Sequence, residues 1–69
     1  METLQINGNK KEFPDGLSRT LADLLAQMGI ENATIVAEID GEIVERDKFS
    51  QTKIINGQSI ELIRFMGGG

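Results

Sequence analysis

One segment of the chain has the periodicity of an amphipathic helix, and this limits the folds that are open to it. Between Thr20 and Met28, the apolar residues Leu21, Leu24, Leu25 and Met28 recur at helical spacing and form a single stripe. Thr20 is a good N-cap, and Gly29 suits the left-handed position that follows a helix. One stripe can cover one face of one sheet. The sequence therefore predicts an α+β domain with two layers.

Alternating apolar residues and turn signals predict the strands of that sheet at 3–6, 10–13, 34–39, 42–45 and 59–65. Asn7-Gly8-Asn9 and Asp40-Gly41 are hairpin turns, and Pro14 ends the second strand. Residues 46–58 are expected to be irregular and anchored by Phe49 and Ile54. The order is β-β-α-β-β-β, and we expect the last strand to lie parallel to the first. This is the β-grasp arrangement of ubiquitin-like proteins, a mixed sheet of four to five strands on one helix.

Charge and length exclude several classes of protein. The 69 residues suffice for one small domain, and the formal net charge of −4 disfavours a nucleic-acid partner. No apolar run approaches the ~20 residues of a membrane span, and no signal-peptide pattern opens the chain. We therefore expect no membrane partner and a cytoplasmic location.

The side chains that usually perform catalysis are missing. The sequence has no histidine, cysteine or tyrosine, so its serines have no base to activate them, and it has no phosphate-binding loop motif. The acidic residues Glu38, Asp40, Glu42 and Glu45 crowd the second hairpin and could form an acid–base pair or a cation site. A solvated hairpin face is the better interpretation. We expect no metal site and no cofactor bound by this chain.

The last three residues, Gly67-Gly68-Gly69, add nothing to a fold, because glycine loses the most conformational freedom on ordering. They could be a frayed end or a remnant of cloning, or they could form a thin arm that enters a narrow tunnel. On the second interpretation, the one useful reactive group is the Gly69 carboxylate, provided that another protein activates it. The expected organisation is a β-grasp domain at 1–66 and a flexible glycine arm at 67–69.

Strand alternation places Ile63 and Phe65 on the face of the sheet away from the helix. Exposed apolar neighbours can mark a partner-binding site. The alternative is a second small core covered by loop residues such as Phe49. Met66, at the root of the arm, could anchor the arm in a partner because methionine adapts to irregular surfaces. The candidate partner-binding residues are therefore Ile63, Phe65 and Met66.

Together, the length, the element order and the glycine end resemble the ubiquitin-like sulfur carriers, most closely the ThiS family of the thiamine pathway. The resemblance covers essentially the whole chain. It includes the segments Leu4–Gly8, Thr20–Leu25 and Ile35–Glu42, and it is best over Ile60–Gly69. Many members end in two glycines, so Gly67 is a mild departure that lengthens the arm.

This resemblance implies a function without autonomous catalysis. An E1-like adenylyltransferase of the ThiF type would use ATP and Mg²⁺ to adenylate the Gly69 carboxylate. Sulfur from a cysteine desulfurase, delivered as a persulfide, would then replace AMP and leave a thiocarboxylate. Thiazole synthase of the ThiG type would take that sulfur for the thiazole ring of thiamine.

Three alternatives remain at this point. The small subunit of molybdopterin synthase shares the arm and the chemistry, but it is usually somewhat longer. A ubiquitin-like binding module or protein modifier would join its arm to lysine. An inert β-grasp domain followed by cloned residues would have no chemistry at all.

Overall fold

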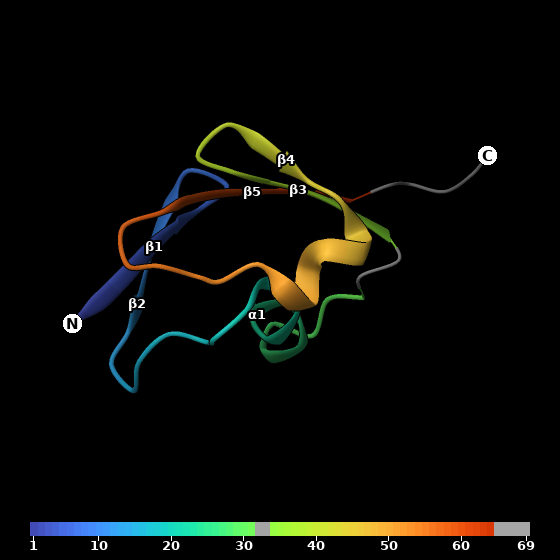
Figure 1. Ribbon diagram of the computed structural model, residues 1–69. Helices are drawn as coiled ribbons and strands as arrows, with labels where there is room; N and C mark the ends of the chain where they lie inside the picture. Colours follow the sequence, from blue (N-terminus) through green and yellow to red (C-terminus); the bar gives the residue numbers. More distant parts are fainter. Residues whose placement is uncertain (32–33, 65–69) are drawn as a thin grey trace.

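The computed structural model describes residues 1–31 and 34–64, and in this part of the chain a five-stranded mixed sheet packs on one side against helices (Figure 1). The strands are β1 (Glu2–Ile6), β2 (Asn9–Phe13), β3 (Ile35–Ile39), β4 (Glu42–Val44) and β5 (Ser59–Arg64). Their order in the sheet is β2-β1-β5-β3-β4. The last strand is therefore central, and it is antiparallel to β3. It is parallel to β1, as the sequence predicted.

Helix α1 (Leu21–Gln27) begins and ends where the sequence indicated. The Asp23 amide donates to the Thr20 hydroxyl at 3.2 Å, which satisfies one free donor of the first turn. At the other end, the Gly29 amide donates to the Ala26 carbonyl and the Ile30 amide donates to the Leu25 carbonyl. This is a Schellman motif, and it requires the positive φ of 73° at Gly29.

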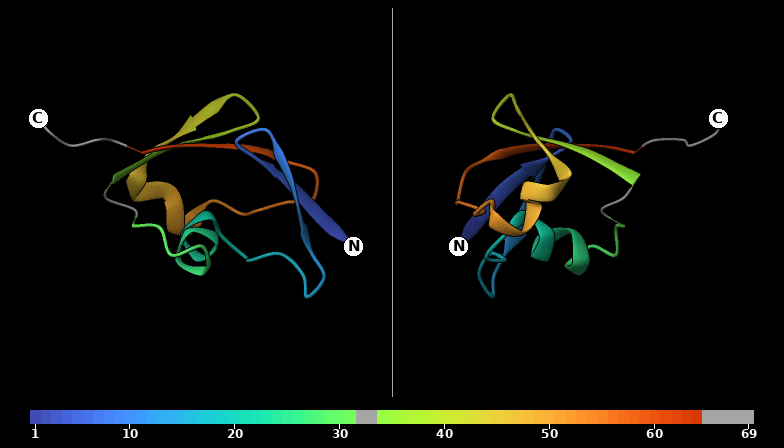
Figure 2. Two further views of the ribbon diagram at one scale, coloured as in Figure 1. Left: turned by 180° about the vertical axis from the view of Figure 1, so that it is seen from behind. Right: turned by 45° about the vertical axis from the view of Figure 1, so that its right-hand side comes forward.

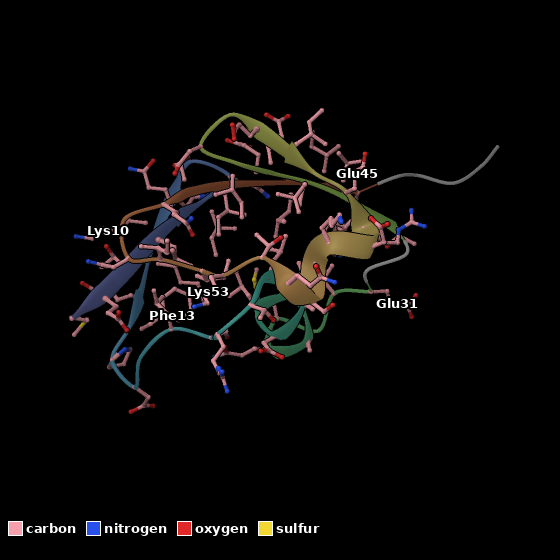
Figure 3. The ribbon with its side chains drawn as sticks, viewed as in Figure 1. Lys10, Phe13, Glu31, Glu45 and Lys53 are labelled. Atoms are coloured by element: carbon pink, nitrogen blue, oxygen red, sulfur yellow. The ribbon has the colours of Figure 1, made fainter. Side chains whose placement is uncertain are left out.

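The core lies between the sheet and the helical layer, and Figure 3 shows side chains filling that space. The stripe residues Leu21, Leu24 and Leu25 are completely buried, and Met28 packs at the margin. The strands contribute Leu4, Ile6, Phe13, Ile35, Ala37, Ile39, Ile60 and Leu62. In β5 the buried residues Ile60 and Leu62 alternate with the exposed Glu61 and Ile63, which agrees with the predicted placement of Ile63 on the face away from the helix.

The expectation of an irregular 46–58 segment is partly wrong. Residues Arg46–Gln51 form a 3-10 helix, η2, which packs against α1. The sequence of η2 has no helical signal because Phe49 is its only buried residue. A 3-10 helix this short can be held in place by a single buried side chain. Phe49 is 1% exposed and Ile54 is 8% exposed, so both anchoring predictions are confirmed.

Candidate functional site

The candidate site is the end of β5, the strand that leads in the sequence to the three glycines. Being central, β5 is held from both sides, by β1 at its start and by β3 along most of its length. Ile60 and Leu62 fix its inner face in the core, at 0% and 8% exposure. A strand held in this way fixes the position and direction of the chain at Arg64, the last described residue.

Two turn residues secure β5 in a way that the sequence analysis missed. Asn7 and Asp40 are the only residues other than glycine with positive φ among those described, at 52° and 51°. The Asn7 side-chain carbonyl accepts a hydrogen bond from the Leu62 amide at 2.7 Å, and the Asp40 carboxylate accepts one from the Ser59 amide at 2.9 Å. Each side chain therefore takes the place of a backbone acceptor where its own strand turns away from β5.

The sequence does hold a signal for these two roles. Each residue precedes a glycine in a hairpin turn, and asparagine and aspartate tolerate the left-handed region while offering an oxygen. The signal identifies the turn but not the target. Leu62 lies 55 residues from Asn7, so the pairing follows only from the assembled sheet.

Ile63 lies on the face of the sheet away from the helix, as predicted, and is 52% exposed. The alternative of a second small core beneath Phe49 is wrong for Ile63, because Phe49 is buried on the helix side of the sheet. Val36 on β3 is the cross-strand partner of Ile63 on β5. Ile43 lies on β4, one strand further from β5, and is 69% exposed. This face therefore has a small apolar surface next to the end of β5.

Carboxylates separate the apolar residues of that face. Glu38 lies directly opposite Glu61 on β5 and opposite Ile43 on β4. Asp40, Glu42 and Glu45 are exposed, so the interpretation of the second hairpin as a solvated acidic face agrees with the structure. Asp40 has a structural role in addition, through its bond to the Ser59 amide.

The remaining predicted site residues, Phe65, Met66, Gly67, Gly68 and Gly69, lie outside the described residues, as does the domain boundary at 66/67. Over 1–31 and 34–64, no group of three or more acidic side chains is arranged to hold a metal ion. No pocket is found in the same part of the chain. The helices within 1–31 and 34–64 lack the length and hydropathy of a membrane span.

Comparison with known proteins places these features in a family. The model of the ThiS family matches residues 2–69, a span that includes the three glycines. The sulfur carrier protein ThiS of Bacillus subtilis is 30% identical over 66 residues, which cover 96% of this chain and 98% of that protein. A thiazole synthase of Paramagnetospirillum magneticum is 32% identical over 66 residues, but the chain spans only 20% of that protein's length.

Solved structures agree with the sequence comparison. The crystal structure of a thiamine biosynthesis protein (ThiS) from Geobacter metallireducens has a TM-score of 0.83 at 29% identity and covers 97% of this chain and 99% of that chain. A solution structure of a thiamine biosynthesis protein from the same organism has a TM-score of 0.79 at 31% identity, with 97% and 87% covered. The predicted β-grasp fold is thereby confirmed.

Proposed function

This chain belongs to the ThiS family, and from that premise we propose that it carries sulfur for thiamine biosynthesis as a thiocarboxylate on Gly69. The observation that supports this most strongly is the family match over residues 2–69, together with near-complete coverage of the Bacillus subtilis sulfur carrier. The match extends through the glycines, which argues against the interpretation of these residues as a remnant of cloning.

Two features of the domain support this role: it lacks the usual catalytic side chains, and it holds the end of β5 in place. The full sequence has no histidine, cysteine or tyrosine, and the described residues form no pocket. The domain fixes the end of β5 at Arg64, and in the sequence Phe65 and Met66 come between this end and three residues without side chains. Glycines let a terminal carboxylate enter a site that is too narrow for other residues. We infer that partner enzymes perform the catalysis and that this chain is their co-substrate.

The proposed chemistry has three steps. First, a carboxylate oxygen of Gly69 attacks the α-phosphorus of ATP in the partner's site, and pyrophosphate leaves. A persulfide sulfur then attacks the carbonyl carbon of the acyl-adenylate, and AMP leaves. Finally, a thiol reduces the resulting acyl disulfide, which frees the thiocarboxylate. ATP and Mg²⁺ belong to the partner in this scheme, and a cysteine desulfurase supplies the persulfide.

Thiazole synthase is the proposed acceptor of the sulfur. A protein that bears this name contains a segment similar to 96% of this chain, which suggests that carrier and synthase act together. The Bacillus subtilis relative and the Geobacter metallireducens crystal structure bear ThiS names, which favours the thiamine pathway over molybdopterin synthesis or protein modification. An adenylyltransferase of the ThiF type and a cytoplasmic location complete the proposal.

Intact-mass spectrometry tests the central step. The full chain is incubated with ATP, Mg²⁺, the adenylyltransferase, the desulfurase and cysteine. We expect the mass gain of one oxygen-to-sulfur exchange, localised to Gly69 by fragmentation. A chain that lacks Gly68 and Gly69 should show no exchange and should keep its melting temperature. Exchange at another position, or no exchange at all, would contradict the proposal.

Ile63, Phe65 and Met66 are the proposed partner-binding residues. The test uses Ile63, because the structure describes Ile63 but not Phe65 or Met66. Ile63→Asp should weaken binding to the adenylyltransferase without unfolding the domain, because the side chain is half exposed. Ile55→Asp is the matched control, since Ile55 is 60% exposed and lies in the loop before β5. Equal effects of the two substitutions on binding would count against a specific surface at Ile63.

A further inference from the structure

The two sides of β5 are not covered over the same length. β3 pairs with β5 from Ile60 to Arg64, whereas β1 pairs only at Ser59 and Ile60. Figure 2 shows β1 beside the first part of β5 and diverging from it, while β3 continues alongside. The last residues of β5 therefore have a neighbouring strand on one side only.

The backbone groups on the uncovered side follow from the hydrogen bonds of Asn7. The Asn7 amide donates to the Ile60 carbonyl at 2.9 Å, and the Asn7 side chain accepts from the Leu62 amide. Even-numbered residues of β5 thus point their amides and carbonyls towards β1, because this direction alternates along a strand. The Leu62 carbonyl and the Arg64 amide point the same way, where β1 has already turned. Neither group has a hydrogen-bond partner among the described residues.

This open edge differs from the outer edges of the sheet. The outer edge at β2 carries three consecutive charged residues, Lys10, Lys11 and Glu12, and Lys10 extends away from the body of the domain (Figure 3). The outer edge at β4 is only three residues long. Charges and short strands are the usual protection against unwanted strand pairing. The free edge of β5 has neither device before Arg64, and its exposed neighbour is the apolar Ile63.

We propose that this free edge of β5, from Leu62 to Arg64, accepts an extended strand of thiazole synthase by backbone pairing. The added strand lies where β1 would have continued, and Asn7 sets the point at which it must stop. β5 leads in the sequence to the three glycines, so a partner that takes the glycines passes this edge. The inference rests on the proposed function, since it needs a partner that takes the arm.

The geometry also defines the chemistry of the added strand. A residue beside Ile63 on the helix-free face should be apolar, because it covers a side chain that is 52% exposed. A second copy of this chain is a poorer occupant. The described edge offers one free carbonyl and one free amide, and two hydrogen bonds do not sustain a dimer. A partner that also binds the arm gains further contacts.

Backbone methylation tests this pairing without changing a side chain. The 69-residue chain is assembled by chemical synthesis with an N-methyl group on the Arg64 amide, which blocks donation and obstructs a neighbouring strand. The control carries N-methyl on the Lys10 amide. Gln5 directs its amide to the Gln58 carbonyl, so its cross-strand neighbour Lys10 points its own amide outward from the sheet. Both amides are thus free edge donors, and both chains should keep the unmodified melting temperature.

Calorimetric titration with the thiazole synthase of the same genome gives the result. We expect N-methyl-Arg64 to raise the dissociation constant about tenfold or more, as for loss of one backbone hydrogen bond, and N-methyl-Lys10 to leave it unchanged. Amide exchange measured by NMR should show the Arg64 amide protected in the complex. Equal affinities of all three chains, or no binding of any of them, would overturn the proposal.

Two further measurements separate this inference from the function. Thiocarboxylate formation on N-methyl-Arg64 tests the carrier role by itself, so normal thiocarboxylate with unchanged synthase affinity refutes only the strand addition. Sedimentation equilibrium of the free chain tests the competing occupant. Self-association that N-methyl-Arg64 abolishes would assign the edge to a second copy and contradict the proposal.

Discussion

Replacing Asn7 tests how the end of β5 is held. In Asn7→Ala, the partly buried Leu62 amide loses its acceptor at 2.7 Å, and alanine must adopt a φ of 52°. The unmet donor costs about 1–3 kcal/mol, and the left-handed conformation costs alanine about 1–2 kcal/mol. The expected loss of roughly 2–5 kcal/mol is comparable to the ~3–5 kcal/mol that a core of this size usually supplies.

Two companion substitutions separate these contributions. Asn7→Gly removes the acceptor but accepts the positive φ, so it should be less destabilising than Asn7→Ala. Asn7→Asp keeps both an oxygen and tolerance of this conformation, so it should stay within about 1 kcal/mol of the parent. The expected order of stability is therefore parent and aspartate, then glycine, then alanine.

Urea unfolding followed by far-ultraviolet circular dichroism is the suitable assay, because the chain has no tryptophan or tyrosine for fluorescence. Thermal melts should show a drop of about 4–8 °C for each kcal/mol lost. Equal stability of the alanine and glycine variants would refute the argument from conformation. An alanine variant within about 0.5 kcal/mol of the parent would refute the importance of the Asn7–Leu62 hydrogen bond.

Three further substitutions test the core and the helix ends by the same unfolding assay. Phe49→Ala should lower the free energy of unfolding by about 3–5 kcal/mol and leave little folded protein, whereas Phe49→Leu should keep the fold. A much smaller loss of stability in Phe49→Ala would mean that η2 is not anchored through Phe49. Thr20→Ala should cost about 1 kcal/mol and Thr20→Asp much less, and the reverse order would contradict capping of the Asp23 amide. Gly29→Ala should cost about 1–2 kcal/mol through backbone strain alone, since no atom lies within 4 Å of the added Cβ. A neutral result would contradict that reasoning.

Local chemistry was sufficient to predict most of the fold. The stripe from Leu21 to Met28 located α1, and the two hairpin turns located four strands, because these patterns depend on neighbours close in sequence. The parallel placement of β5 beside β1 was also correct. It followed from two features of the sequence: both strands are apolar, and the first hairpin precedes a helical crossover.

The site was less predictable because its key contacts join distant residues. Asn7 was recognised as a turn residue, but its hydrogen bond to Leu62 needs the assembled sheet. Phe49 was expected to be buried, but its side of the sheet depends on η2, whose short helix leaves no periodic signal. The exposure of Ile63 followed from alternation, whereas the missing strand beside Arg64 depends on where β1 turns.

The central position of β5 has a consequence for synthesis on the ribosome. The β1–β2 and β3–β4 hairpins can form as they emerge, but β1 and β3 have no common neighbour until Ser59–Arg64 has been made. A chain that stops earlier lacks the strand joining the two halves and leaves their apolar faces exposed to proteases. A released chain can therefore form the complete sheet only if it has been translated through Arg64. The order of the strands thus makes folding a check that the chain has been translated at least as far as Arg64.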